Sequence, residues 1–160
     1  MKKLIILAIC FAMICSFVLP AGAGSNDSTT INISLTDTAD ILVVNSTGGD
    51  VWDTTGGLGA TLTSPTFTIS NEGYVQVDVT INATDTAAWT LETAPEHNQF
   101  TLMQNQTGSW VDIPEDAAIS FLSNFAWDGN ETFEFQMELP TSSSTATGQQ
   151  ITVTFEATVD

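Results

Sequence analysis

The sequence predicts an all-β protein with the architecture of an antiparallel β-sandwich, of either the jelly-roll or the immunoglobulin-like type. Three observations predict this class. Apolar and polar residues alternate over much of the chain, clusters of Gly, Asn and Asp separate the alternating runs, and no segment has a convincing helical periodicity. Such runs are typical of a sandwich in which each strand exposes one face to water.

Residues 1–23 have the features of a secretory signal peptide. Two lysines precede an apolar run over 4–19, and the small residues Ala21-Gly22-Ala23 follow it. We therefore expect cleavage before Gly24 and a secreted product without cysteine, because both cysteines fall within the apolar run. An uncleaved anchor is the alternative, but the run is shorter than the roughly 20 residues of a membrane span. We expect no stable membrane insertion after cleavage.

The remaining chain divides into two parts. The N-terminal segment, 24–40, contains Ile31, Ile33 and Leu35 in alternation with polar residues, which predicts a first strand. The rest, 41–160, is of a size that folds around one core, so we expect a single sandwich domain.

Three long alternating runs predict the clearest strands of this domain, at 75–81, 133–139 and 151–159. The polar stretch 141–149 lies between the last two runs and predicts that they form a hairpin. The segment 115–122 is compatible with a short helical turn. Weaker apolar runs predict further strands at 41–44, 62–69, 89–91 and 100–102.

The charge of the expected product is extreme. All 19 acidic residues lie beyond the leader, and the only two basic residues are Lys2 and Lys3 within it. So acidic a surface repels nucleic acid and anionic membranes, and we expect neither as a partner. The fold must depend on apolar burial and backbone hydrogen bonds, since ion pairs with lysine or arginine are excluded.

Six Asn-x-Ser/Thr motifs predict N-linked glycosylation and hence a location at the cell surface or outside the cell. Two of these asparagines fall on the polar phase of a strand and two fall in loops, where a glycan has room. The six are Asn26, Asn32, Asn45, Asn82, Asn105 and Asn130.

The sequence contains no arrangement of residues that is typical of catalysis, and we predict neither an enzyme nor a cofactor. His97 is the only histidine, and no nucleophile motif accompanies it. A zinc site normally needs several His or Cys ligands, and a single histidine cannot supply them. The chain has so many carboxylates that pairs of them arise by chance, so a pair is no evidence of a glycosidase.

Calcium is the one metal ion that the sequence leaves open, because it binds oxygen ligands from flexible loops. None of the acidic clusters has the spacing of an EF-hand loop, so we predict no specific metal site. The candidate clusters are Asp50 with Asp53, Asp112 with Glu115 and Asp116, and Asp128 with Glu131.

Two stretches resemble a recurring pattern of secreted prokaryotic β-sandwiches. Residues 67–81, Phe-Thr-Ile-Ser-Asn-Glu-Gly-Tyr-Val-Gln-Val-Asp-Val-Thr-Ile, resemble the strand, Asn-x-Gly turn and strand of those domains. Residues 133–140 followed by 151–157 resemble their closing hairpin. In these stretches the chain is similar to the camelysin-like biofilm-matrix fibre proteins of bacteria and the bundling-pilus subunits of archaea. The sequons and the acidity favour the archaeal group.

This resemblance implies a sandwich whose N-terminal strand is donated to the neighbouring subunit, so that copies form a fibre. The matching segment is 28–36, with Ile31, Ile33 and Leu35 as the donor residues. An ordinary first strand within its own sandwich is the alternative. Fibre proteins of this kind commonly carry many lysines. Because 24–160 has none, isopeptide crosslinks are excluded, and bundling of like-charged fibres would need cations or glycans.

Two functions of different classes follow. The first is a structural subunit of a surface filament or biofilm-matrix fibre, whose partner is itself. The second is a monomeric secreted or S-layer-associated module that recognises carbohydrate or a partner protein. Its first candidate sugar contacts are Trp52 and Trp127, each beside an Asp and near a Gly. The four tryptophans are otherwise expected to anchor the core or the strand ends.

Overall fold

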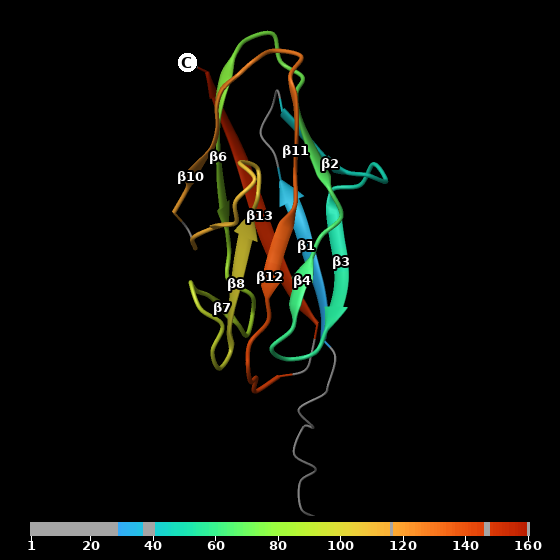
Figure 1. Cartoon of the computed structure of the whole chain (residues 1–160), viewed down its shortest axis with the longest axis vertical. Helices are drawn as coiled ribbons and strands as arrows, with labels where there is room; N and C mark the ends of the chain where they lie inside the picture. The colour runs from blue at the N-terminus through green and yellow to red at the C-terminus, as the bar shows by residue number, and fades with distance from the viewer. Residues whose placement is uncertain (1–28, 37–40, 116, 146–147, 160) are drawn as a thin grey trace, which may run out of the picture.

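The structure is a computed structural model that describes residues 29–36, 41–115, 117–145 and 148–159. The expected leader, its cleavage site and Asn26 lie outside the described residues. The described chain is a β-sandwich without helices, which confirms the predicted class (Figure 1). It therefore includes no helix that is long and apolar enough to cross a membrane.

Thirteen strands make up the described fold. Their bounds, in chain order, are β1 (Thr29–Thr36), β2 (Ile41–Asn45), β3 (Val51–Gly56), β4 (Thr61–Thr63), β5 (Phe67–Asn71), β6 (Val77–Ala83), β7 (Thr90–Leu91), β8 (Gln99–Gln104), β9 (Val111–Asp112), β10 (Ile119–Phe125), β11 (Asn130–Phe133), β12 (Phe135–Glu138) and β13 (Gln149–Val159).

One layer of the sandwich is a five-stranded sheet in the order β10-β6-β13-β1-β3. The facing layer consists of two sheets, β11-β5-β2 and β4-β12-β8-β7, with β9 paired to β8. The chain passes directly from β4 to β5 and from β11 to β12, and hydrogen bonds between Ser64 and Phe135 bridge the two junctions. In Figure 1, β11 and β12 pass in front of β1 and β13.

Packed phenylalanines hold the two layers together. Phe133 lies at the centre of this cluster, with ring centroids 5.0 Å from Phe121 and 5.6 Å from Phe155, which both belong to the five-stranded layer. On its own layer it packs against Phe67 at 5.7 Å and Phe135 at 5.2 Å. Four of these rings are at most 2% exposed and Phe121 is 5% exposed, so the cluster forms the middle of the core.

The expected hairpin of the last two long strands is wrong. β12 pairs with β4 and β8, whereas β13 pairs with β6 and β1 in the other layer. The polar stretch after β12 thus carries the chain from one layer to the other. The run 133–139 is also divided, because Glu134 donates its backbone N–H to the Asn105 side chain, 2.7 Å away.

The short helical turn expected at 115–122 is also absent from the described residues of that segment. Residues 119–125 instead form β10, which pairs antiparallel with β6 at the edge of its sheet. The register shifts twice along this pair, between Ser120 and Leu122 and between Leu122 and Phe125. These irregularities let Phe121, Leu122 and Phe125 all reach the core.

Candidate functional site

The predicted first strand lies inside a sheet of its own chain. β1 pairs in parallel with β13 and antiparallel with β3, over six residue pairs on each side. Ile33 faces Ile151 on one side and Trp52 on the other. Ile31 and Ile33 are completely buried, whereas the side chain of Leu35 lies outside the described residues.

β1 is the first described element, and its C-terminal end leads to the body of the sandwich. Residues 37–40 connect it to β2, which belongs to the opposite layer. Within the described residues, β3 has no ladder partner besides β1. Without β1 the five-stranded sheet would therefore open into a groove between the edges of β13 and β3.

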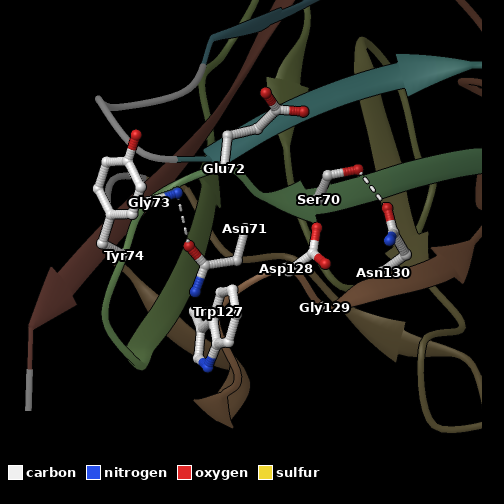
Figure 2. Close-up of a pocket in the computed structure, with 9 residues that line it drawn as sticks. All are labelled: Ser70, Asn71, Glu72, Gly73, Tyr74, Trp127, Asp128, Gly129 and Asn130. Carbon is white, nitrogen blue, oxygen red and sulfur yellow. Dashed lines mark hydrogen bonds between the residues drawn. The ribbon is translucent and has the colours of Figure 1, made fainter.

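A pocket of about 320 Å³ lies at one end of the sandwich, and we call it the tip pocket. Its walls come from the loop between β5 and β6 and from the loop between β10 and β11 (Figure 2). The lining residues are Ser70, Asn71, Glu72, Gly73, Tyr74, Trp127, Asp128, Gly129 and Asn130.

A single buried side chain organises both loops of the tip pocket. Asn71 is 2% exposed, and its Nδ2 donates to the carbonyl oxygens of Val75 and Phe125 at 2.9 and 3.0 Å. Its Oδ1 accepts the backbone N–H of Gly73 at 3.0 Å, as in an Asx turn. The three bonds satisfy this amide, so the two loops are held in fixed positions.

The backbone of Asn71 extends this connection to a tight turn in the second loop. Its N–H donates to the Gly129 carbonyl at 3.0 Å, and its carbonyl accepts the Asp128 N–H at 3.1 Å. Asp128 has a φ of 56°, a left-handed conformation that Asp tolerates better than most residues. A Cβ on Gly129 would lie 2.7 Å from the Ala126 carbonyl oxygen, so this position requires glycine.

The tip pocket presents two exposed aromatic side chains. Tyr74 is 93% exposed and Trp127 is 63% exposed. In Figure 2 they lie on either side of Asn71, while Glu72 and Asp128 occupy other parts of the rim. This end of the sandwich therefore combines aromatic rings with carboxylates.

The two tryptophans that the sequence suggests as sugar contacts lie in different environments. Trp52 is 4% exposed and packs in the core beside β1, so it cannot serve as an exposed contact. Trp127 lines the tip pocket. Sequence reasoning missed Tyr74, although this only tyrosine directly follows the turn 71–73. Trp89 is a core anchor as expected, while Trp110 is partly exposed.

The predicted glycosylation sites differ in how their side chains are used. Asn45 is half-buried and organises a turn, accepting from two N–H groups of 47–49 and donating to the Val51 carbonyl. Asn32 donates to Asp53, and Asn105 accepts from Glu134. These three asparagines are thus engaged within the fold.

The other two described sequons lie on strands of opposite layers. Asn82 is half-buried on β6, opposite Thr154. Asn130 is exposed at the start of β11, and its Oδ1 accepts the Ser70 hydroxyl at 2.6 Å. Asn130 is the only fully exposed sequon asparagine in the described chain, and it also lines the tip pocket.

Among the described residues, no three or more His, Cys, Asp or Glu side chains are grouped so as to hold a metal ion. Asp116, part of one candidate calcium cluster, lies outside those residues. His97 is exposed, and its Nδ1 lies 2.9 Å from the hydroxyl of Ser142. This contact joins two loops that a β-bridge also connects.

No known family model matches this chain, and no curated protein is detectably similar to it. Two features of the fold bear on function, the internal position of β1 and the composition of the tip pocket.

Proposed function

We propose that this protein is an extracellular, N-glycosylated structural protein, whose copies assemble into a surface filament or biofilm-matrix fibre by donating β1 to a neighbour. The observation that carries the proposal is the position of β1. It is the first described element of the chain, and it occupies the interior of a sheet between β13 and β3. A strand so placed can be supplied equally well by a second copy.

The contacts of β1 are strong enough to join two subunits. Burial of Ile31 and Ile33, both 0% exposed, contributes about 1.5–3 kcal/mol for each side chain. Backbone ladders on both edges add hydrogen bonds over six residue pairs each. Because donation replaces each contact by the same contact from another chain, exchange leaves the contact energy nearly unchanged.

The charge of the protein also favours this mode of assembly. Subunits with 19 acidic residues and no lysine or arginine after residue 3 repel one another and cannot form such ion pairs across an interface. Apolar burial and backbone hydrogen bonds do not depend on complementary charges. An exchanged strand therefore supplies a joint that so acidic a surface would otherwise lack.

Engineered cysteines test the proposal directly, because residues 24–160 contain none. Asn32 on β1 faces Asp53 on β3, and facing residues of antiparallel strands have Cα atoms about 4.5–5.5 Å apart, within disulfide range. One chain would carry Asn32→Cys, and a second, tagged chain would carry Asp53→Cys. The two are unfolded together, refolded as an equal mixture and oxidised.

We expect a mixed disulfide dimer on a non-reducing gel, because β1 of one chain lies in the sheet of the other. Asn32→Cys mixed with Thr107→Cys, an exposed position outside this sheet, is the matched control for random oxidation. If the mixture stays monomeric while the double variant closes an internal disulfide, β1 remains in its own sheet. The monomeric binding module would then be the better account.

Deletion of 24–37 gives an independent comparison. For a fibre subunit, negative-stain electron microscopy should show filaments from the intact product and none from the shortened chain. A binding module would sediment as a monomer when intact and show no filaments, and deletion would only lower its stability, because β1 supplies the buried Ile31 and Ile33.

A further inference from the structure

We propose that the tip pocket is a carbohydrate-binding site, in which a sugar ring packs on Trp127 and Tyr74 and its hydroxyl groups bond to the surrounding polar groups. This site is separate from the strand exchange proposed above. It assigns a ligand class to residues that the assembly of a fibre does not need.

The first argument is the exposure of two large aromatic side chains. Tyr74 and Trp127 leave 93% and 63% of their surface in water, although both residue types gain by burying their rings. Both side chains are carried by loops that Asn71 holds with its three side-chain hydrogen bonds. Aromatic side chains on fixed loops lose little conformational entropy on binding and therefore suit a recognition surface.

The second argument is the set of polar groups that remain available. The Trp127 indole N–H and the Tyr74 hydroxyl can donate, and the carboxylates of Glu72 and Asp128 can accept. Within the described part of the chain, none of these four groups has a hydrogen-bond partner. A ligand that both donates and accepts would satisfy them.

These groups distinguish a sugar from other ligands. An anion is repelled by the carboxylates of Glu72 and Asp128. An ammonium ion would suit the carboxylates and the rings but would leave the indole and hydroxyl donors unused. A sugar hydroxyl donates and accepts, and the face of its ring is apolar. The cavity of about 320 Å³ is at the small end of the range for small-molecule sites, which suits one or two sugar rings.

The tip pocket lies far from the start of β1. It is formed where β6 begins, and Val77 of β6 faces Val159 at the end of β13. β1 begins at the other end, with Ile31 beside Gln149 at the start of β13 (Figure 1). Loss of sugar binding can therefore be told apart from loss of strand exchange.

The experiment measures binding of the secreted protein to an array of neutral, amino and acidic glycans, together with N-glycans released from this protein itself. We expect binding to neutral sugars, weakened about tenfold or more by Trp127→Ala and by Tyr74→Ala. Trp110→Ala is the matched control, because Trp110 is also exposed but lies outside the pocket, and it should bind as the unchanged protein does.

The probes also identify the source of the sugar. Binding of the released N-glycans would indicate a glycan of a neighbouring copy, and binding of array glycans alone would indicate an external polysaccharide. The proposal is wrong if no glycan binds, if Trp127→Ala and Tyr74→Ala both bind normally, or if tetramethylammonium binds in place of sugars. The disulfide assay on the same variants keeps this result separate from that of assembly.

Discussion

Replacing Asn71 by Asp tests whether one buried amide holds the two loops of the tip pocket. The change conserves size and the acceptor oxygen for the Gly73 N–H. It replaces the donor nitrogen by an oxygen that faces the carbonyls of Val75 and Phe125 at 2.9 and 3.0 Å. Both favourable contacts then become repulsive whenever the introduced carboxyl is charged.

The structure gives the magnitude of the loss. Two hydrogen bonds contribute about 1 kcal/mol each, and two carbonyls left without a donor cost about 1 kcal/mol each in addition. The position is only 2% exposed, so water cannot compensate. We expect the free energy of unfolding to fall by about 4 kcal/mol at neutral pH. At about 4 °C per kcal/mol for a domain of this size, the Tm falls by about 15 °C.

The loss should depend on pH, because burial beside two carbonyl oxygens raises the pKa of the introduced carboxyl above its value of about 3.9 in the unfolded chain. Below about pH 4 the carboxyl is protonated in both states and can donate one bond, so part of the stability returns. The destabilisation grows as pH rises from there to the raised pKa.

Thermal unfolding followed by circular dichroism from pH 3 to 8 measures this difference. Asn124→Asp is the control, because it makes the same chemical change at an exposed position and keeps the acceptor for Gln76. Its effect should stay within about 0.5 kcal/mol. An Asn71→Asp variant that is as stable as the unchanged protein at pH 7, or equally unstable at every pH, would refute the proposed role of Asn71.

Three further outcomes can be measured by the same unfolding assay. Ile33→Ala should cost about 2–5 kcal/mol because Ile33 is completely buried, while Thr158→Ala, at an exposed position, should cost less than about 0.5 kcal/mol. Gly129→Ala should destabilise by about 1–3 kcal/mol, because the added methyl group meets the Ala126 carbonyl; Gly57→Ala has no atom within 4 Å and should be tolerated, so equal losses would contradict this reasoning. Raising NaCl from about 0.01 to 1 M should raise the Tm, since salt screens 19 carboxylates in a chain that has no lysine or arginine after residue 3; a Tm independent of salt would contradict it.

Strands could be predicted wherever the alternation of apolar and polar residues matches the alternation of buried and more exposed positions. Val77 to Ala83 alternate buried and half-buried positions along β6, as the sequence pattern requires. The same rule could not reveal the break in 133–139, because Phe133, Glu134 and Phe135 keep the alternation across it. The break is made by a side chain distant in sequence, Asn105, which takes the N–H of Glu134.

The error at β10 has a different cause. Two shifts in strand register bury Phe121, Leu122 and Phe125 together, a spacing that regular strand alternation does not produce. The hairpin error has a different cause, since alternation in 151–159 shows which face is buried and not which strand is adjacent. Which strands pair is decided by the packing of both layers, and no single run of the sequence carries that information.

The tip pocket was only half predictable. Trp127 beside Asp128 in a turn was a valid signal, and the same signal at Trp52 was misleading because that residue faces the core in β3. Alternation could not separate the two, because Val51 and Trp52 are adjacent apolar residues followed by polar ones, although Trp52 lies within a strand. The turn at 71–73 was visible in the sequence, but the hydrogen bond from Asn71 to Phe125, 54 residues away, has no local signature.

The parallel pairing of β1 and β13 also determines how the chain responds to a pulling force. Ile31 lies beside Gln149 at the start of β13, and β13 continues to Val159 at the opposite end. Tension between Thr29 and Val159 therefore slides the two strands along each other. The hydrogen bonds between the paired residues of β1 and β13 then bear the force at the same time and must break together. In a hairpin pulled from its open end, the hydrogen bonds break one at a time. Mechanical resistance of this kind comes from geometry alone and requires no covalent crosslink.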